Sequence, residues 1–152
     1  MSENIYEALR ASHETQRSLC RKLLRATPQS GRRSELFREL RIELAAHAAA
    51  EERFLYAPIL MDDMGLNSSR HALAEHHEID ECVEELSKAD EKGDSWSDKA
   101  KELSHIVHHH LREEETKFFQ MSGKILTEAQ KITLAKHYLK DFERMKRVLS
   151  EK

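Results

Sequence analysis

Apolar residues recur every three or four positions over most of the 152-residue chain, which is the spacing of amphipathic helices. The pattern predicts a first helix over about residues 3–26, and residues 27–31 are typical of a turn. A second helix should begin near Arg32 and be distorted or ended by Pro58, because proline cannot continue the helical hydrogen bonds. Gly65 then closes the connection. The first half of the chain is therefore expected to form one pair of helices.

The second half repeats this arrangement. A third helix is predicted to start at residues 67–69, which are N-cap types, and to run to about Glu91. Residues 92–95 form the next turn. A fourth helix should follow as far as Met121, where the Ser-Gly pair at 122–123 is expected to break it. Two helix pairs joined by short loops result.

A fifth amphipathic segment follows the second pair. Thr127 and Gln130 form a Thr-x-x-Gln capping box ahead of it. The predicted fold class is therefore all-α, an up-down-up-down antiparallel four-helix bundle over about residues 3–122 with an additional C-terminal helix over about residues 127–150. We expect one domain over residues 1–152. The last helix should pack outside the bundle or at a dimer contact.

Composition and charge exclude several classes of protein. Charged residues make up 35% of the chain, and only four glycines and two prolines interrupt it, which favours long helices over strands. The net charge of -3 comes with no basic stripe, so no nucleic-acid partner is expected. No apolar stretch reaches membrane-spanning length and no signal-peptide core is present, so we expect a cytoplasmic protein without a membrane partner. Two cysteines are too few for a disulfide scaffold.

Six histidine and glutamate residues form a pattern that occurs twice, with a constant offset of 63 residues. In each copy two histidines lie 34 residues apart, and the second begins a His-x-x-x-Glu. Because a helix places residues i and i+4 on one face, each His-x-x-x-Glu can point both side chains toward the bundle interior. The six candidate metal ligands are His13, His47, Glu51, His76, His110 and Glu114.

Such a set predicts a pair of metal ions. Four imidazoles and two carboxylates in an apolar interior cost several kcal/mol in desolvation unless they are paired. Two divalent cations would satisfy them, with the carboxylates bridging the ions and each ion taking two imidazoles. Imidazole and carboxylate without thiolate suit iron, manganese or zinc. A bridging oxo or hydroxo would bring each ion to five ligands and leave an open position for dioxygen, peroxide or nitric oxide.

Four segments make the chain resemble the hemerythrin-like domains of the histidine-histidine-glutamate (HHE) cation-binding family. They are SHETQ at His13, HAAAEERFLYAP at His47, EHHEI at His76 and HLREEETKFF at His110, and the resemblance covers about residues 5–122. It implies an up-down four-helix bundle around a non-haem di-iron centre. The six residues above take the ligand positions, and dioxygen or another small diatomic or peroxide ligand is the implied partner.

The chain departs from the oxygen-carrying members of that family in two places. Those proteins have a further histidine on the third helix, one turn before the first, where this chain has Ala72. They also use an aspartate with a wider spacing on the fourth helix. Here Glu114 gives the shorter spacing, although Glu115 would give the wider one. The predicted site is therefore more symmetric and more open, which argues against simple reversible oxygen transport.

Three functional hypotheses follow. The leading one is a di-iron protein that binds or senses dioxygen, other oxygen-derived small molecules or iron itself. The second is an enzyme, a di-iron peroxidase or a nitric-oxide or oxidative-stress protein, including one that repairs iron-sulfur clusters. The third is an interaction module in which the metal is only structural. A homodimer through the final helix is a further expectation.

Several residues outside the repeated pattern have two interpretations. Additional ligation is weighed against an ordinary helix-surface charge for Glu43, His77, Asp80 and Glu115. His105 and His109 lie one turn apart, so they are either surface residues or part of a second, surface metal site. Tyr56 is assigned to core packing, with a hydrogen bond at the site as the alternative.

Overall fold

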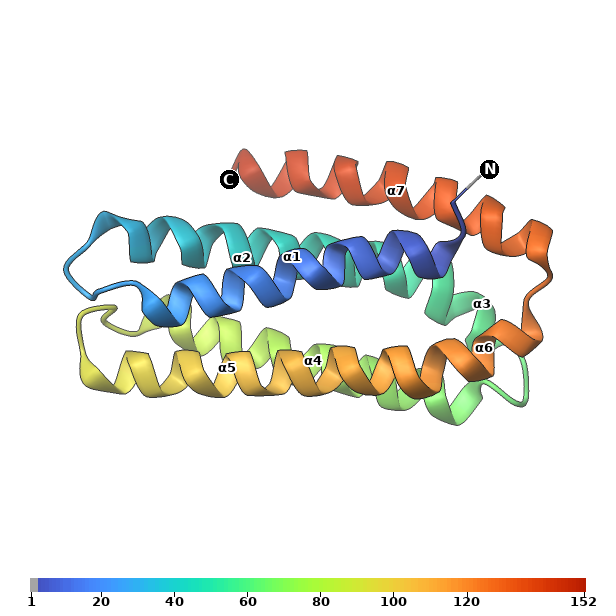
Figure 1. Ribbon diagram of the computed structural model, residues 1–152, viewed down its shortest axis with the longest axis horizontal. Helices are drawn as coiled ribbons and strands as arrows, with labels where there is room; N and C mark the ends of the chain where they lie inside the picture. The colour runs from blue at the N-terminus through green and yellow to red at the C-terminus, as the bar shows by residue number, and fades with distance from the viewer. Residues whose placement is uncertain (1–2) are drawn as a thin grey trace.

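The computed structural model describes residues 3–152, so the first two residues of the predicted domain lie outside the described part of the chain. The structure is all-helical, with no strand among the described residues. Four long helices lie side by side in an antiparallel bundle, and a fifth runs along its outside (Figure 1). The bundle helices are α1 (Ile5–Arg25), α2 (Gly31–Glu51), α4 (Leu66–Lys88) and α5 (Asp94–Glu113), and the outer helix is α7 (Glu128–Ser150).

Capping boxes begin the first and last helices. At α7 the predicted Thr127 and Gln130 pair is confirmed, since each side chain binds the other residue's backbone N–H. At α1 the equivalent pair is Asn4 and Glu7, which the sequence reading had not identified. Each box satisfies backbone donors that the first helical turn leaves unpaired.

Two short π-helical segments interrupt the second helix of each pair. Segment η1 (Glu52–Tyr56) joins α2 to α3 (Ala57–Leu60), and η2 (Glu114–Phe118) joins α5 to α6 (Phe119–Ile125). The predicted distortion before Pro58 is therefore present in η1. Proline does not explain both π-helical segments, because η2 is π-helical like η1 and no proline follows it. Such segments occur frequently at functional sites.

The predicted helix break at residues 122–123 was wrong. Helix α6 continues through Gly123 and ends at Ile125. Ser122 is fully buried and its Oγ lies 2.8 Å from the hydroxyl of Tyr6, a hydrogen bond that anchors the helix to α1. The tertiary contact outweighs the low helix propensity of the Ser-Gly pair.

Two apolar clusters fill the bundle, one toward each end. The first surrounds Trp96 and Leu103 near the loops that join α1 to α2 and α4 to α5. The second surrounds Leu55 and Ile59 and includes residues of α6 and α7. Five of the six predicted ligands lie on the four bundle helices and Glu114 lies on η2, all at the level between the clusters.

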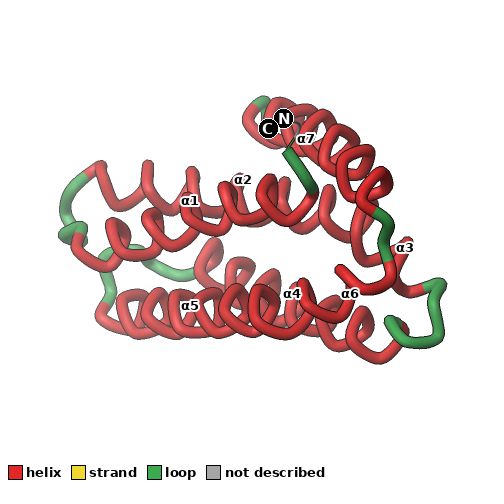
Figure 2. The backbone as a smooth tube through the Cα atoms, turned by 45° about the vertical axis from the view of Figure 1, so that its right-hand side comes forward, coloured by secondary structure: helices red, strands yellow, loops and turns green. Residues whose placement is uncertain are grey.

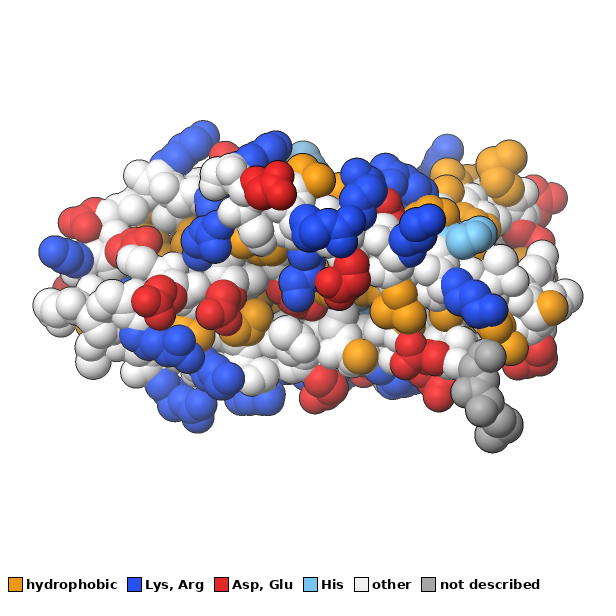
Figure 3. Space-filling view, turned by 90° about the horizontal axis from the view of Figure 1, so that it is seen from above, with side chains coloured by type: hydrophobic (Ala, Val, Ile, Leu, Met, Phe, Trp, Pro, Cys, Tyr) orange, Lys and Arg blue, Asp and Glu red, His pale blue; other side chains and the backbone are white. Residues whose placement is uncertain are grey.

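Helix α7 packs along α1 and α2, which confirms the expectation that it lies outside the bundle (Figure 2). Its apolar stripe faces inward, with Tyr138 and Phe142 buried and Leu134 partly buried. Lysine and arginine side chains gather on the outward face of this region (Figure 3). Among the described residues, none of the helices has the length and apolarity needed to cross a membrane.

Candidate metal centre

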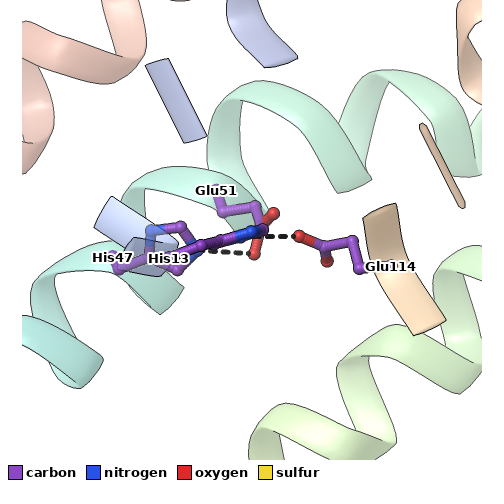
Figure 4. A group of neighbouring side chains, drawn as sticks. All are labelled: His13, His47, Glu51 and Glu114. Carbon is purple, nitrogen blue, oxygen red and sulfur yellow. Dashed lines mark ion pairs between the residues drawn. The ribbon is translucent and has the colours of Figure 1, made fainter. Parts of the chain in front are cut away.

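The four bundle helices each supply one histidine to a single buried site, and α2 and η2 add one glutamate each. The donor atoms form two groups, each lying within 4.8 Å of one another. Both groups contain the same two carboxylates, and every member is buried. The first group is His13, His47, Glu51 and Glu114, shown in Figure 4, and the second is Glu51, His76, His110 and Glu114. The six residues predicted from the repeat are thus brought together.

Glu51 connects the two groups. Its Oε1 lies 3.2 Å from Nε2 of His47, one turn earlier on the same helix, and 3.2 Å from Nε2 of His76 on α4. Its Oε2 is buried and has no hydrogen-bond partner within residues 3–152. One carboxylate therefore faces imidazoles of both groups and keeps an oxygen free for a further contact.

Glu114 makes the equivalent connection from the other half of the chain. Its Oε1 lies 3.2 Å from Nε2 of His13 on α1, and its Oε2 lies 3.6 Å from Nε2 of His110 on α5. The site has approximate two-fold symmetry, as the 63-residue offset predicted. Each carboxylate can bridge two ions, since each contacts one histidine of either group.

The outward nitrogen, Nδ1, of each of the four site histidines has a hydrogen-bond partner. Two of these partners are related to each other by the 63-residue offset. His13 Nδ1 lies 2.7 Å from Glu115, and His76 Nδ1 lies 2.8 Å from Glu52. Glu52 and Glu115 are equivalent under the 63-residue offset. A carboxylate that accepts from Nδ1–H fixes the tautomer in which the Nε2 lone pair points inward.

The other two partners break the repeat. His110 Nδ1 lies 2.9 Å from Glu75, whereas His47 Nδ1 lies 2.8 Å from the hydroxyl of Tyr138 on α7. The residue equivalent to Glu75 is Ser12, whose short side chain does not make this contact. Helix α7 supplies the missing partner. Sequence reasoning missed both Glu75, which has no acidic counterpart, and Tyr138, which lies outside the repeat.

The buried donor atoms fit a metal ion. In the described part of the chain, Nε2 of His13, His47 and His110 has no hydrogen-bond partner, and neither does Oε1 of Glu114. A buried polar atom left without a partner costs about 1–3 kcal/mol. Several such atoms converging on one region are satisfied together by a cation that accepts imidazole nitrogen and carboxylate oxygen.

In the metal-free protein, protons on two of the histidine rings partly balance the charge of the buried carboxylates. Burial by itself would lower the pKa of His13, but the adjacent carboxylates of Glu114 and Glu115 outweigh it and raise that pKa to about 9. Burial likewise opposes protonation of His76, yet hydrogen bonds to Glu51 and Glu52 raise its pKa to about 10. Cation binding must therefore displace protons from these rings.

The pKa of His47 is lowered and that of Glu114 is raised, so each of these two residues favours its neutral form. Burial lowers the pKa of His47 to about 4, despite the favourable charge of Glu51. Burial and the nearby Glu51 carboxylate raise the pKa of Glu114, because two buried carboxylates resist ionising together. A positive ion between the two carboxylates would relieve this repulsion.

Tyr56 reaches the middle of the site from η1. Its hydroxyl lies 3.0 Å from Glu51 Oε1 and 3.3 Å from His76 Nε2, and it also contacts Glu114 Oε2. Burial, followed by the charges of the two carboxylates, raises the pKa of this phenol well above its usual value. The structure therefore shows the hydrogen bond that the sequence left as the alternative to packing.

Two cavities reach the buried site from different sides. One, of about 390 Å³, lies between α2 and α4 and is lined by His47, His76 and His110. The other, of about 370 Å³, lies between α4 and α5 and is lined by His110 and Glu114. Ala72, which stands where oxygen carriers have a further histidine, lines the second cavity and leaves that space open.

The remaining candidates lie around the site rather than among its inward donors. Glu115 binds His13 Nδ1 as described, and Glu43 accepts a hydrogen bond from Ser12 Oγ at 2.7 Å. His77 is exposed and pairs with Glu81, and Asp80 is exposed at the rim of the larger cavity. His105 is absent from the donor groups found within residues 3–152, whereas His109 pairs with Glu113 at 3.0 Å.

The fold and this site together define a helical-bundle protein with a buried histidine–glutamate cluster suited to metal binding. Residues 4–122 match the Hemerythrin HHE cation binding domain, and the chain belongs to this family. The resemblance stated from the sequence motifs is thereby confirmed.

Two known proteins are similar to the chain. A crystal structure of a Hemerythrin HHE cation binding domain-containing protein from Mycobacterium kansasii superposes with a TM-score of 0.86 and 26% identity. The match covers 96% of this chain and 89% of that one, so it includes α7. A protein named DNA nickase from Nostoc sp. is 28% identical over 117 residues, which are 76% of this chain. The matched region spans only 32% of that protein.

Proposed function

We propose that this protein holds a pair of non-haem iron ions and binds an oxygen-derived small molecule there: dioxygen, peroxide or nitric oxide. The observation that carries the proposal is the pair of four-donor groups that share both carboxylates. Shared carboxylates keep two cations close together, and each cation has two imidazoles of its own.

The donor chemistry supports iron. Imidazole and carboxylate bind iron, manganese and zinc, and no thiolate is close enough to favour a softer ion, since both cysteines lie in the apolar cluster around Trp96. Four protein donors for each ion leave positions open on an octahedral iron. Bound iron would supply redox chemistry and a place for a small ligand.

The larger cavity offers a route for that ligand. It runs between α2 and α4 to three of the four histidines, and small or apolar residues line much of it, among them Ala48, Leu73 and Ile79. Such a lining suits a small molecule of low charge. The apolar clusters toward the two ends of the bundle would keep bulk water from reaching the site along the bundle axis.

Peroxide turnover is the second candidate, and Tyr56 favours it. Its phenol is fully buried, hydrogen-bonds to both shared carboxylates and keeps its proton, because its pKa is raised by burial and by those carboxylates. A phenol that keeps its proton next to the shared carboxylates is suited to donating a hydrogen bond to a peroxide oxygen that gains negative charge during reduction.

The test is iron loading of the metal-free full chain under anaerobic conditions, followed by exposure to air, hydrogen peroxide or nitric oxide. We expect two ferrous ions per chain and absorption bands of a coupled ferric pair after oxidation. His47→Ala and Glu51→Ala should abolish both, whereas His77→Ala, an exposed histidine on α4, should retain them. Iron below one ion per chain, or a loaded protein inert to all three reagents, would contradict the proposal.

Peroxide consumption separates the two candidates. If the enzyme hypothesis is correct, the ferrous protein supplied with excess ascorbate as electron donor consumes peroxide repeatedly, and Tyr56→Phe slows turnover while keeping two ions bound. If the protein only binds the ligand, consumption stops after one equivalent per iron pair. A purely structural metal predicts a third result, in which zinc restores the fold fully and oxidants leave the protein unchanged.

A further inference from the structure

The two halves of the repeat differ in what covers their outer surface. On the first half, α7 packs over α1 and α2, and the helix faces beneath it carry small buried residues. These residues are Ala8, Ser12, Ala46 and Ala50. Small side chains let α7 approach closely enough for Tyr138 to reach His47.

The 63-residue offset assigns each of these small residues a polar counterpart. They are His71, Glu75, His109 and Glu113, on α4 and α5. Helix α7 covers α1 and α2, so these four remain at the surface, with both histidines more than half exposed. The same position in the fold is therefore a helix-docking face in one half and a histidine–glutamate cluster in the other.

The four side chains converge on one another. His71 Nε2 lies 2.9 Å from Glu113 and 3.5 Å from Glu75, and His109 Nε2 lies 3.0 Å from Glu113. Donor atoms of His71, Glu75 and Glu113 all lie within 4.8 Å of one another, with His109 beside them. Two imidazoles and two carboxylates make the same kind of ligand set as each half of the buried site.

This cluster opens onto the buried site through the smaller cavity. His71, Glu75 and Glu113 line its outer part, and His110 and Glu114 line it as well. His110 is only 3% exposed, and its Nε2 lacks a hydrogen-bond partner within residues 3–152. An unpartnered buried donor thus shares a cavity of about 370 Å³ with the surface cluster.

Glu75 contacts both the buried site and the surface cluster. Its Oε1 lies 2.9 Å from Nδ1 of the buried His110, and its Oε2 lies 3.5 Å from Nε2 of the exposed His71. One carboxylate therefore spans from the surface cluster to a ligand of the inner site. Ordinary surface ion pairs explain the individual histidine–glutamate contacts, but they do not explain this bridge or the cavity behind it.

We propose that His71, Glu75, His109 and Glu113 form a surface site for a divalent cation, from which the buried site is loaded through the cavity between α4 and α5. The two carboxylates attract the cation, and the imidazoles hold it in place of water. Ala72 keeps the passage open beyond them. Lys117 also lines the cavity, and its positive charge would weaken cation binding there, which is consistent with a transient site. The proposal rests on the buried site binding metal and is independent of its use of iron.

The test is the rate of Co²⁺ uptake by the metal-free full chain, followed by the visible absorption of Co²⁺ bound to nitrogen and oxygen ligands. The variants are His71→Ala and Glu113→Gln. Glu75 is left intact because it also holds His110. The matched control is His77→Ala, which removes an exposed histidine paired with Glu81 at 2.8 Å on the same helix. We expect uptake at low Co²⁺ to slow by about tenfold in both variants, because His71→Ala removes a metal donor and Glu113→Gln removes a negative charge that attracts the cation, with unchanged final content.

Each other outcome overturns the proposal. Equal rates in all proteins would show that the surface cluster does not load the site, and an equal slowing in His77→Ala would reduce the effect to general surface charge. Unchanged early rates with lower final content would make the cluster part of the resident site. If the parent protein takes up no Co²⁺, the buried metal site itself fails, which is a separate result from equal rates.

Discussion

The Nδ1 atom of His47 lies 2.8 Å from the hydroxyl oxygen of Tyr138, so the C-terminal helix α7 is joined to a ligand-bearing helix of the bundle. The Tyr138 hydroxyl takes the role that Glu75 has in the other half of the repeat. There Glu75, on the bundle helix α4, is the partner of His110 Nδ1. Helix α7 therefore contributes a hydrogen-bond partner to the site and also covers apolar residues of α1 and α2.

Tyr138→Phe should weaken metal binding without unfolding the protein. The change removes one hydroxyl and leaves His47 Nδ1 without its partner, and loss of such a partner lowers metal affinity by about 10–100-fold. The aromatic ring remains stacked on Phe142, with centroids 5.6 Å apart, so the packing of α7 is preserved. Competition with a chelator measures the affinity. Tyr6→Phe is the control, because its hydroxyl binds Ser122 and touches none of the six residues. Equal affinity in the two variants would contradict the role of Tyr138.

The metal-free protein should be most stable near pH 6.5 and lose stability in both directions. The raised pKa values of His13 and His76, about 9 and about 10, mean that their stabilisation is complete below 6.5 and is lost as the pH rises through those values. His47, with its pKa lowered to about 4, makes folding less favourable as the pH falls from 6.5, because the unfolded chain takes up that proton more readily.

Urea denaturation of the metal-free protein across this range measures the effect. His76→Gln should flatten the loss at alkaline pH, whereas His77→Ala, at an exposed position, should leave the profile unchanged. A stability that rises steadily from neutral to alkaline pH would contradict the protonated state of these rings.

Leu103→Ala should lower stability without changing metal affinity. Leu103 is fully buried in the cluster around Trp96, and truncation of a buried leucine to alanine costs about 2–5 kcal/mol. Chemical denaturation gives the free energy of unfolding, and chelator competition gives the affinity. Leu139→Ala is the matched control, since that side chain is 38% exposed and should cost little. A large fall in affinity for Leu103→Ala would show that the cluster and the site are coupled.

Ala48→Phe should slow ligand binding to the iron-loaded protein. Ala48 lines the larger cavity beside His47, so a bulky ring there obstructs the proposed route. Stopped-flow measurement of nitric oxide binding should show a lower association rate with unchanged iron content. Ala74→Phe, at an exposed position of α4, supplies the control. Identical rates for the parent and Ala48→Phe would place the route elsewhere.

The sequence predicted the repeated features of this molecule well, because periodicity and a constant offset act through local geometry. Helical spacing was enough to direct His47 and Glu51 to one face, and the offset placed their counterparts opposite them. Features outside the repeat were not predictable in this way. Tyr138 contacts a residue 91 positions away, and nothing in its local sequence marks that contact. The continuation of α6 through Gly123 likewise depends on Tyr6, a residue of the first helix.

The π-helical segment η1 makes the site sensitive to the length of the chain as well as to the identity of its side chains. In a regular α-helix, residues five positions apart point about 140° away from each other. The wider turn of η1 instead brings Tyr56 round to the same side as Glu51, where the two side chains lie 3.0 Å apart. Removing one residue between them would rewind this turn and carry the phenol away from the carboxylates. All six histidine and glutamate residues would still be present in such a chain, so gaps in an alignment, as well as substitutions, can change the chemistry of a relative.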